Sequence, residues 1–137
     1  MVNQSVNQTE VNNNLIIVGI GASAGGLEAL RLLVPRLPID TRVVYILAQH
    51  LDPKHSSMLV PILSRETQLP IKELQHKQIL EAGNLYIIPP AMDAYYSKDR
   101  MHLEKATGIG PKPSVDRLLT SLAENHGARC IGIILSG

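Results

Sequence analysis

A serine and a histidine each follow an apolar run of the sequence, and together they could hydrolyse an acyl bond. Ser23 lies in a glycine-rich turn, residues 21–26, directly after the apolar run 15–20. His50 follows a second apolar run, residues 43–48. A serine hydroxyl can attack a carbonyl carbon, and an imidazole can take up the hydroxyl proton and return it to the leaving group. The two residues are therefore a candidate nucleophile and general base.

The glycine-rich turn could also supply the hydrogen-bond donors that acyl transfer needs. An amphipathic segment follows it, and the first N–H groups of a helix have no partner inside the helix. The amides of Ala24, Gly25 and Gly26 are therefore candidates to stabilise a developing oxyanion. The alternative is that the Ser23 hydroxyl only caps this helix, and the turn alone does not decide between the two roles.

The same segment also fits a dinucleotide-binding pattern, Gly19-x-Gly21-x-x-Ala24, between a predicted strand and a predicted helix. A Rossmann nucleotide-binding domain is thus a second alternative. That pattern requires an acidic residue at the end of the second strand, to bind the ribose hydroxyls. Here Gln49 and His50 stand at that place, which argues against a nucleotide without excluding it.

The order of apolar runs and amphipathic segments predicts how these residues are positioned. The runs alternate with helical patterns, so we expect an α/β fold with a doubly wound, mostly parallel sheet in three Rossmann-like layers, incomplete at the C-terminus. Because parallel strands end at one edge of a sheet, Ser23, His50 and the Ser136-Gly137 pair should meet there. We expect Ser23 Oγ within hydrogen-bonding reach of His50 Nε2, directly or after a rotamer change. The predicted strands are residues 15–20, 43–48, 71–74, 85–88 and 130–135, the predicted helices start near residues 27, 58 and 115, and residues 94–96 and 101–103 form a predicted hairpin.

Composition narrows the possible functions. The chain has 137 residues, a formal charge of +1, 45% apolar residues, and neither Phe nor Trp. It contains no basic stripe for nucleic acid and no run of ~20 apolar residues for membrane insertion. The N-terminus does not resemble a signal peptide, so we expect a cytoplasmic protein. Cys130 is expected to be a buried structural thiol. No metal is expected, and four histidines are predicted to be solvated: His55, His76, His102 and His126.

Five separated motifs resemble, in order and spacing, the catalytic domain of the CheB methylesterases. They are residues 17–26, the Gln49-His50 pair, and residues 86–90, 112–116 and 132–137. The resemblance runs from about residue 15 to the end. It implies that Ser23 is the nucleophile and His50 the general base, and that no cofactor is needed. The implied substrate is a glutamyl methyl ester on the cytoplasmic helices of chemoreceptors; many members also deamidate glutamines.

The family pattern also indicates what lies outside the matched motifs. Its triad aspartate follows the Leu-Ser-Gly motif, so we expect it beyond Gly137; Asp93 and Asp116 are weaker candidates for that role. We expect residues 1–13 to be a disordered polar leader without the family's receiver domain, and residues 14–137 to be the methylesterase domain, cut before the triad loop and inactive alone. Residues 49–53 resemble a variant fused to a receptor methyltransferase domain. An inactive docking or regulatory domain of the same fold remains an alternative.

Overall fold

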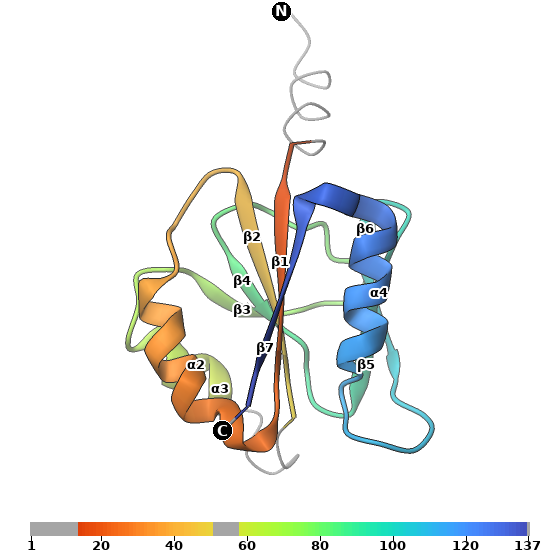
Figure 1. The fold of residues 1–137 in the computed structure, drawn as a ribbon, viewed down its shortest axis with the longest axis horizontal. Coiled ribbons are helices and arrows are strands. Elements are labelled where there is room, and N and C mark those ends of the chain that lie inside the picture. The colour runs from red at the N-terminus through yellow and green to blue at the C-terminus, as the bar shows by residue number, and fades with distance from the viewer. Residues whose placement is uncertain (1–13, 51–57, 137) are drawn as a thin grey trace, which may run out of the picture.

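The computed structural model describes residues 14–50 and 58–136, and its main element is a five-stranded parallel sheet (Figure 1). The strand order is β3-β4-β2-β1-β7, and a separate antiparallel pair, β5-β6, forms the predicted hairpin. The strands are β1 (Ile16–Ala22), β2 (Val43–Gln49), β3 (Ile71–Glu73), β4 (Leu85–Ile87), β5 (Met92–Ser97), β6 (Arg100–Lys105) and β7 (Cys130–Leu135). The helices are α2 (Leu27–Leu33), α3 (Leu59–Ser64) and α4 (Val115–His126), with short 3-10 turns η1 (Ala24–Gly26), η2 (Val34–Arg36) and η4 (Gly127–Arg129).

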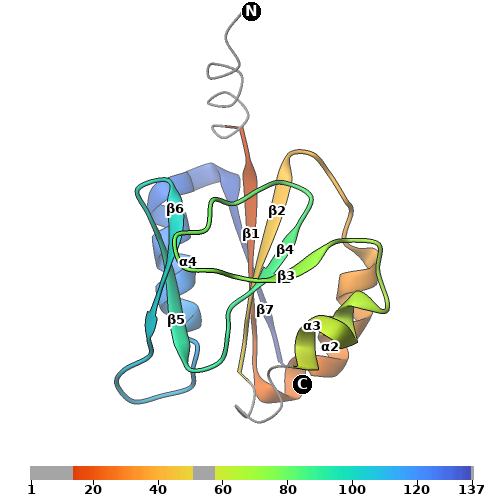
Figure 2. The same ribbon diagram turned by 180° about the vertical axis from the view of Figure 1, so that it is seen from behind.

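The sheet separates two apolar cores, which makes the fold three-layered. Helices α2 and α3 cover one face, while α4 and the β5-β6 hairpin cover the other (Figures 1 and 2). Successive strand residues point to opposite faces. Ile17 of β1 accordingly packs in a cluster with Leu118 of α4, whereas Ile20 packs in a cluster with Leu30 of α2. The α/β fold with a parallel sheet is confirmed.

The start and end of α4 follow from the chemistry of the residues at its two ends. The Ser114 hydroxyl accepts a hydrogen bond from the Arg117 amide at 3.2 Å and so caps the helix at its N-terminus. Gly127 ends the helix with a positive φ of 54°, a conformation that glycine adopts without a Cβ clash. Pro61 lies in the first turn of α3, where its missing N–H breaks no helical bond. The leader, residues 1–13, lies outside the described residues, and the division of the chain at residue 14 stays a prediction.

The prediction that residues 130–135 form a buried strand is wrong in its burial. The strand forms, but Ile131 is 51% exposed and Ile134 is 66% exposed. Among the described residues, β7 is the last strand in the sheet order and pairs only with β1. Cys130 is only partly buried, although its surroundings are apolar enough that burial raises the pKa of its thiol.

Two of the four histidines predicted to be solvated are half-buried against aromatic rings. His126 packs edge-on against Tyr96, with ring centroids 4.4 Å apart, and burial lowers the pKa of its imidazole. His102 stacks on Tyr95 at 5.2 Å. The sequence places His102 on a strand and His126 near a helix end, but it does not reveal that the hairpin packs against α4. His76 is exposed, as predicted, and His55 lies outside the described residues.

Candidate active site

The pairing of β1 with β2 brings Ser23 and His50 to the same edge of the sheet. The two strands are parallel and in register, with Ala22 opposite Gln49. Each candidate residue is the next one along its strand, and the His50 amide donates to the Ala22 carbonyl at 2.8 Å. Both side chains are half-buried. The sheet therefore places the candidate nucleophile and the candidate base at the ends of adjacent strands.

The turn that carries Ser23 is fixed by backbone and side-chain hydrogen bonds from three elements. The Ser23 amide donates to the Leu135 carbonyl of β7 at 3.2 Å. The Ser23 carbonyl accepts from the Gly26 amide at 2.8 Å and from Gln49 Nε2 at 2.7 Å. Ser23 precedes η1 with an extended backbone, and its side chain makes no capping hydrogen bond. The hydroxyl is thus free of the capping role, which was the alternative to a chemical one.

Of the three candidate oxyanion donors, the Gly26 amide is already used. It donates to the Ser23 carbonyl at 2.8 Å, so it has another acceptor in this conformation, and its role as an oxyanion donor stays a prediction. Ala24 and Gly25 are exposed at the start of η1, and no backbone hydrogen bond from their amides occurs among the described residues. Their N–H groups remain candidates for the oxyanion, next to the Ser23 side chain.

His50 makes a different hydrogen bond from the one expected. Its Nε2 lies 2.8 Å from the Pro113 carbonyl oxygen, and no hydrogen bond joins His50 to Ser23 Oγ among the described residues. A carbonyl only accepts, so Nε2 carries the proton and Nδ1 is the nitrogen that can take one up in the neutral ring. For Nε2 to reach Ser23, the ring must rotate and leave Pro113. That rotamer change stays a prediction.

Neither aspartate considered from the sequence contacts His50. Asp93 of β5 is 4% exposed, and its Oδ1 accepts a hydrogen bond from the Ser114 amide at 2.8 Å. Asp116 is exposed in the first turn of α4, where the helix dipole stabilises a negative charge. The part of the chain that the structure describes therefore places no carboxylate on the His50 ring.

Sequence reasoning assigned no role to Gln49 or Pro113, although both lie at the site. Gln49 is 5% exposed at the end of an otherwise apolar strand. A polar residue at a buried strand end was the available signal, because buried polar groups need hydrogen-bond partners. The role of the Pro113 carbonyl could not be predicted, because every residue has a backbone carbonyl and the sequence does not show where it points.

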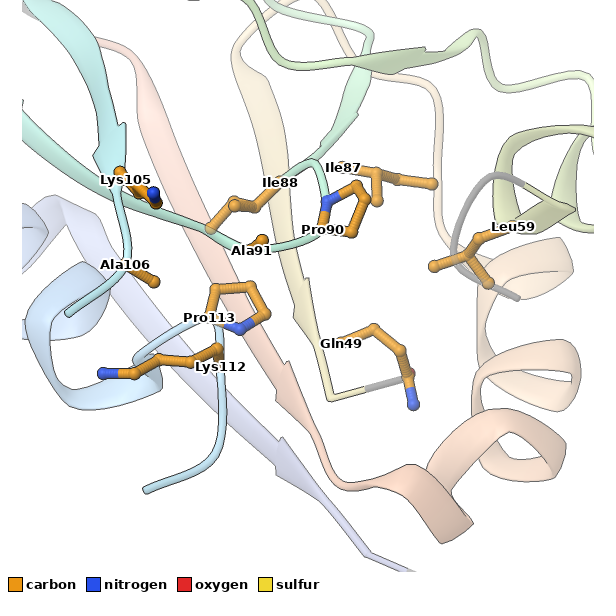
Figure 3. Close-up of a pocket in the computed structure, with 10 residues that line it drawn as sticks. All are labelled: Gln49, Leu59, Ile87, Ile88, Pro90, Ala91, Lys105, Ala106, Lys112 and Pro113. Atoms are coloured by element: carbon orange, nitrogen blue, oxygen red, sulfur yellow. The ribbon is translucent and has the colours of Figure 1, made fainter. Parts of the chain in front are cut away.

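A cavity of about 320 Å³ lies beside the end of β2 (Figure 3), and neither Ser23 nor His50 is among the described residues that line it. Pro113 and Lys112 line it from the segment before α4, and Gln49 lines it from the end of β2. Most of the other lining side chains are apolar: Leu59, Ile87, Ile88, Pro90, Ala91 and Ala106, with Lys105 at one side. The cavity is of the size and character of a small-molecule or side-chain site.

The family model described as "CheB methylesterase" matches residues 18–137. The chain belongs to the CheB methylesterase family. A solved structure, the CheB methylesterase catalytic domain of Thermotoga maritima, is similar with a TM-score of 0.80 and 28% sequence identity, over 90% of this chain and 68% of that one.

Curated relatives in the CheB methylesterase family carry the name protein-glutamate methylesterase/protein-glutamine glutaminase. One from Xanthomonas oryzae pathovar oryzae is 33% identical over 88% of this chain and 35% of its own length. One from Methanospirillum hungatei is 29% identical over 93% of this chain and 37% of its own length. A relative named as putative, from Leptospira interrogans, is 29% identical over 90% of this chain and 65% of its own length. The chain therefore spans about a third of the first two relatives.

The glycines of the dinucleotide pattern have a packing role in this CheB methylesterase fold. Gly19 and Gly21 lie inside β1, not in the turn after it. A Cβ on Gly21 would stand 2.5 Å from a methyl of Val115, and one on Gly19 would stand 2.6 Å from Leu119 Cδ2. In a nucleotide site the second glycine leaves room for a pyrophosphate. Here α4 fills that room, which is a physical reason against the nucleotide-binding alternative.

In residues 14–50 and 58–136, no group of three or more His, Cys, Asp or Glu side chains could hold a metal ion. None of the helices in residues 14–50 and 58–136 has the length and apolar character needed to cross a bilayer.

Proposed function

We propose that the protein hydrolyses glutamyl methyl esters on chemoreceptors, with Ser23 as nucleophile and His50 as general base. One observation carries the proposal: the two residues lie at adjacent strand ends in a chain of the CheB methylesterase family. The names of the relatives support the substrate class and add a second reaction, the deamidation of protein glutamine.

The geometry supports a two-step acyl transfer. Ser23 Oγ attacks the ester carbonyl while His50 takes its proton, and the carbonyl π bond opens to an oxyanion beside the Ala24 and Gly25 amides. Collapse of this intermediate breaks the bond to methoxide, which takes the proton from His50 and leaves as methanol. A water molecule then attacks the acyl-serine by the same route, and this step yields glutamate and regenerates Ser23. With a glutamine side chain, ammonia leaves in place of methanol.

Further parts of the proposal concern the protein beyond the described residues. The carboxylate that orients His50 is expected after Gly137, in agreement with the family resemblance. The partners are the methylated cytoplasmic helices of chemoreceptors, with a fused receptor methyltransferase domain as a further expectation. A cytoplasmic location follows from such a substrate.

The test is the substitution Ser23→Ala in the full-length protein, assayed by methanol release from methylated receptor. The expected loss is roughly 10⁴–10⁶-fold in kcat, because the attacking oxygen is removed. The melting temperature should stay within about 2 °C, since the Ser23 side chain makes no capping bond. Ser64→Ala, at the exposed end of α3, is the matched control and should keep wild-type activity.

Two results would contradict this assignment. Retained methanol release from the Ser23→Ala variant would require another nucleophile. A wild-type protein that binds methylated receptor but releases neither methanol nor ammonia would instead favour the docking or regulatory alternative.

A further inference from the structure

The cavity beside the end of β2 combines an apolar lining with a positively charged end. Figure 3 shows Lys105 and Lys112 on one side of the cavity and Leu59 on the opposite side. This pattern suits an aliphatic carboxylate, because the lining removes its methylene groups from water while its charge meets a cation. We propose that the cavity is a substrate subsite, which binds the side chain of a glutamate that flanks the methyl ester on the receptor. The inference rests on the proposed function, because the ester must dock at Ser23 for its neighbour to reach the cavity.

The cavity lies close to the candidate catalytic pair without including it. Gln49 lines the cavity and directly precedes His50 in the chain. Pro113 also lines it, and the Pro113 carbonyl oxygen stands 2.8 Å from His50 Nε2. The lining therefore comes next to His50 on two elements, β2 and the segment before α4. A substrate segment whose ester reaches the catalytic pair thus has a neighbouring side chain within reach of the cavity.

Lys105 supplies the charge with which the carboxylate would pair. Its side chain is exposed at the end of β6, and it forms no ion pair within the part of the chain that the structure describes. Lys112 is already engaged, because its Nζ donates to the Thr107 carbonyl and stands 4.0 Å from Asp93 Oδ2. The nearby carboxylate of Asp93 offsets one of the two lysine charges. This end of the cavity therefore has an excess of positive charge, which Lys105 carries.

The size and lining of the cavity favour an acidic side chain over other anions. Its volume of about 320 Å³ lies at the lower end of the range for ligand sites, which suits one or two side chains. Phosphate groups are commonly held by several backbone N–H groups or by arginine. None of the described lining residues is an arginine, and most of them are apolar. A glutamate side chain matches both the apolar part and the charged end.

The experiment uses helical peptides that carry one glutamyl methyl ester in a neutral sequence. A single glutamate, or glutamine as its reference, is placed in turn at each position within about four residues of the ester, roughly one helical turn on either side. With the full-length wild type, glutamate at one or two positions should raise kcat/KM about two- to fivefold over glutamine, mainly through a lower KM. This is the effect expected of an exposed ion pair.

Substitutions of Lys105 test whether the preference arises in the cavity. Lys105→Gln should bring the ratio of glutamate to glutamine peptides close to one and leave kcat on the glutamine peptides unchanged. Lys105→Glu should reverse the preference, so that a peptide lysine at the same position is hydrolysed faster than a glutamate. Lys72→Gln is the matched control, because it removes an exposed lysine of β3 outside the cavity. It should keep the wild-type ratio.

Peptide binding separates this inference from the proposed function. The dissociation constants of the same peptides are measured by fluorescence anisotropy with full-length Ser23→Ala, which requires no hydrolysis. If the wild type hydrolyses no ester, but binding still favours the glutamate peptide and Lys105→Gln removes that preference, the proposed function fails and the subsite stands. If the esters are hydrolysed but glutamate gives no advantage at any position, the inference is overturned. An advantage that survives Lys105→Gln overturns it as well.

Discussion

Strands β1 and β7 are paired neighbours of similar composition, yet they differ sharply in burial. Both are apolar runs, and they run parallel with Gly19 opposite Gly132. The side chains of Ile17 and Ile20 in β1 are fully buried. Ile131 and Ile134 in β7 are 51% and 66% exposed.

The difference lies in the neighbours of each strand. β1 has a strand on either side and helices over both faces, so each of its side chains meets an apolar layer. Among the described strands β7 stands last in the sheet order, and α4 covers only part of its surface there. An apolar run therefore predicts a strand but not how deeply it is buried, and matched substitutions in the two strands measure that difference.

The largest difference is expected from shortening one isoleucine in each strand. Ile20→Ala should lower the free energy of unfolding by about 2–5 kcal/mol, because it removes buried methyl groups and leaves a cavity between the sheet and α2. Ile134→Ala should change it by no more than about 0.5 kcal/mol, since the side chain is mostly in water. Urea unfolding of both variants gives the two values. Equal losses would mean that β7 is covered in solution and that the contrast is absent.

A smaller difference is expected from adding a methyl group to one glycine in each strand. In Gly21→Ala the new Cβ would stand 2.5 Å from a Val115 methyl, and valine is too stiff to move aside without shifting α4. The free energy of unfolding should fall by about 1–3 kcal/mol.

Gly132→Ala is the matched control for this overpacking. The atom nearest to the new Cβ would be Leu119 Cδ1 at 3.7 Å, which is an ordinary contact. The free energy of unfolding of this variant should therefore lie within about 0.5 kcal/mol of the wild-type value. Thermal unfolding followed by circular dichroism measures both. A Gly21→Ala variant as stable as Gly132→Ala would show that α4 does not press on β1.

The smallest effect is expected at His126, in the last turn of α4 before β7. Burial against Tyr96 lowers the pKa of His126 below its ordinary value of 6.5, so the unfolded chain binds a proton more readily than the folded one. Stability from this residue is fully present above about pH 6.5 and is lost as the pH falls through the lowered pKa. His126→Gln should flatten this part of the stability curve, measured by urea unfolding between pH 7.5 and roughly 5.

The control for the pH experiment is His76→Gln, which replaces an exposed histidine. It should keep the wild-type slope between the same pH values. If His126→Gln also keeps the wild-type slope, the pH dependence belongs to other groups, and folding does not disfavour the protonation of His126.

The candidate site divides into a part that the sequence predicts and a part that it does not. Ser23 and His50 could be placed at one edge, because each follows an apolar run and parallel strands end together. Their bonding partners could not be placed. The Pro113 carbonyl that holds His50 comes from a segment 63 residues further along the chain, and residue type carries no information about a carbonyl's direction.

The amino-acid sequence by itself determined the elements and their order. Strand and helix patterns depend on the spacing of apolar residues, and caps such as Ser114 act within a few residues, so both are readable along the chain. The glycine-rich turn, the two catalytic candidates and the family resemblance are local in the same sense.

Only the tertiary structure decided which groups meet and which remain exposed. In the folded chain the Gly26 amide bonds within its own turn, and His50 Nε2 contacts the Pro113 carbonyl. Asp93 is buried and accepts from the Ser114 amide, whereas β7 is largely exposed. Each of these outcomes depends on the packing of the hairpin, α4 and the sheet against one another. The physical reason is that hydrogen-bond partners and burial are set by distances in space between segments far apart in sequence, which local spacing does not encode.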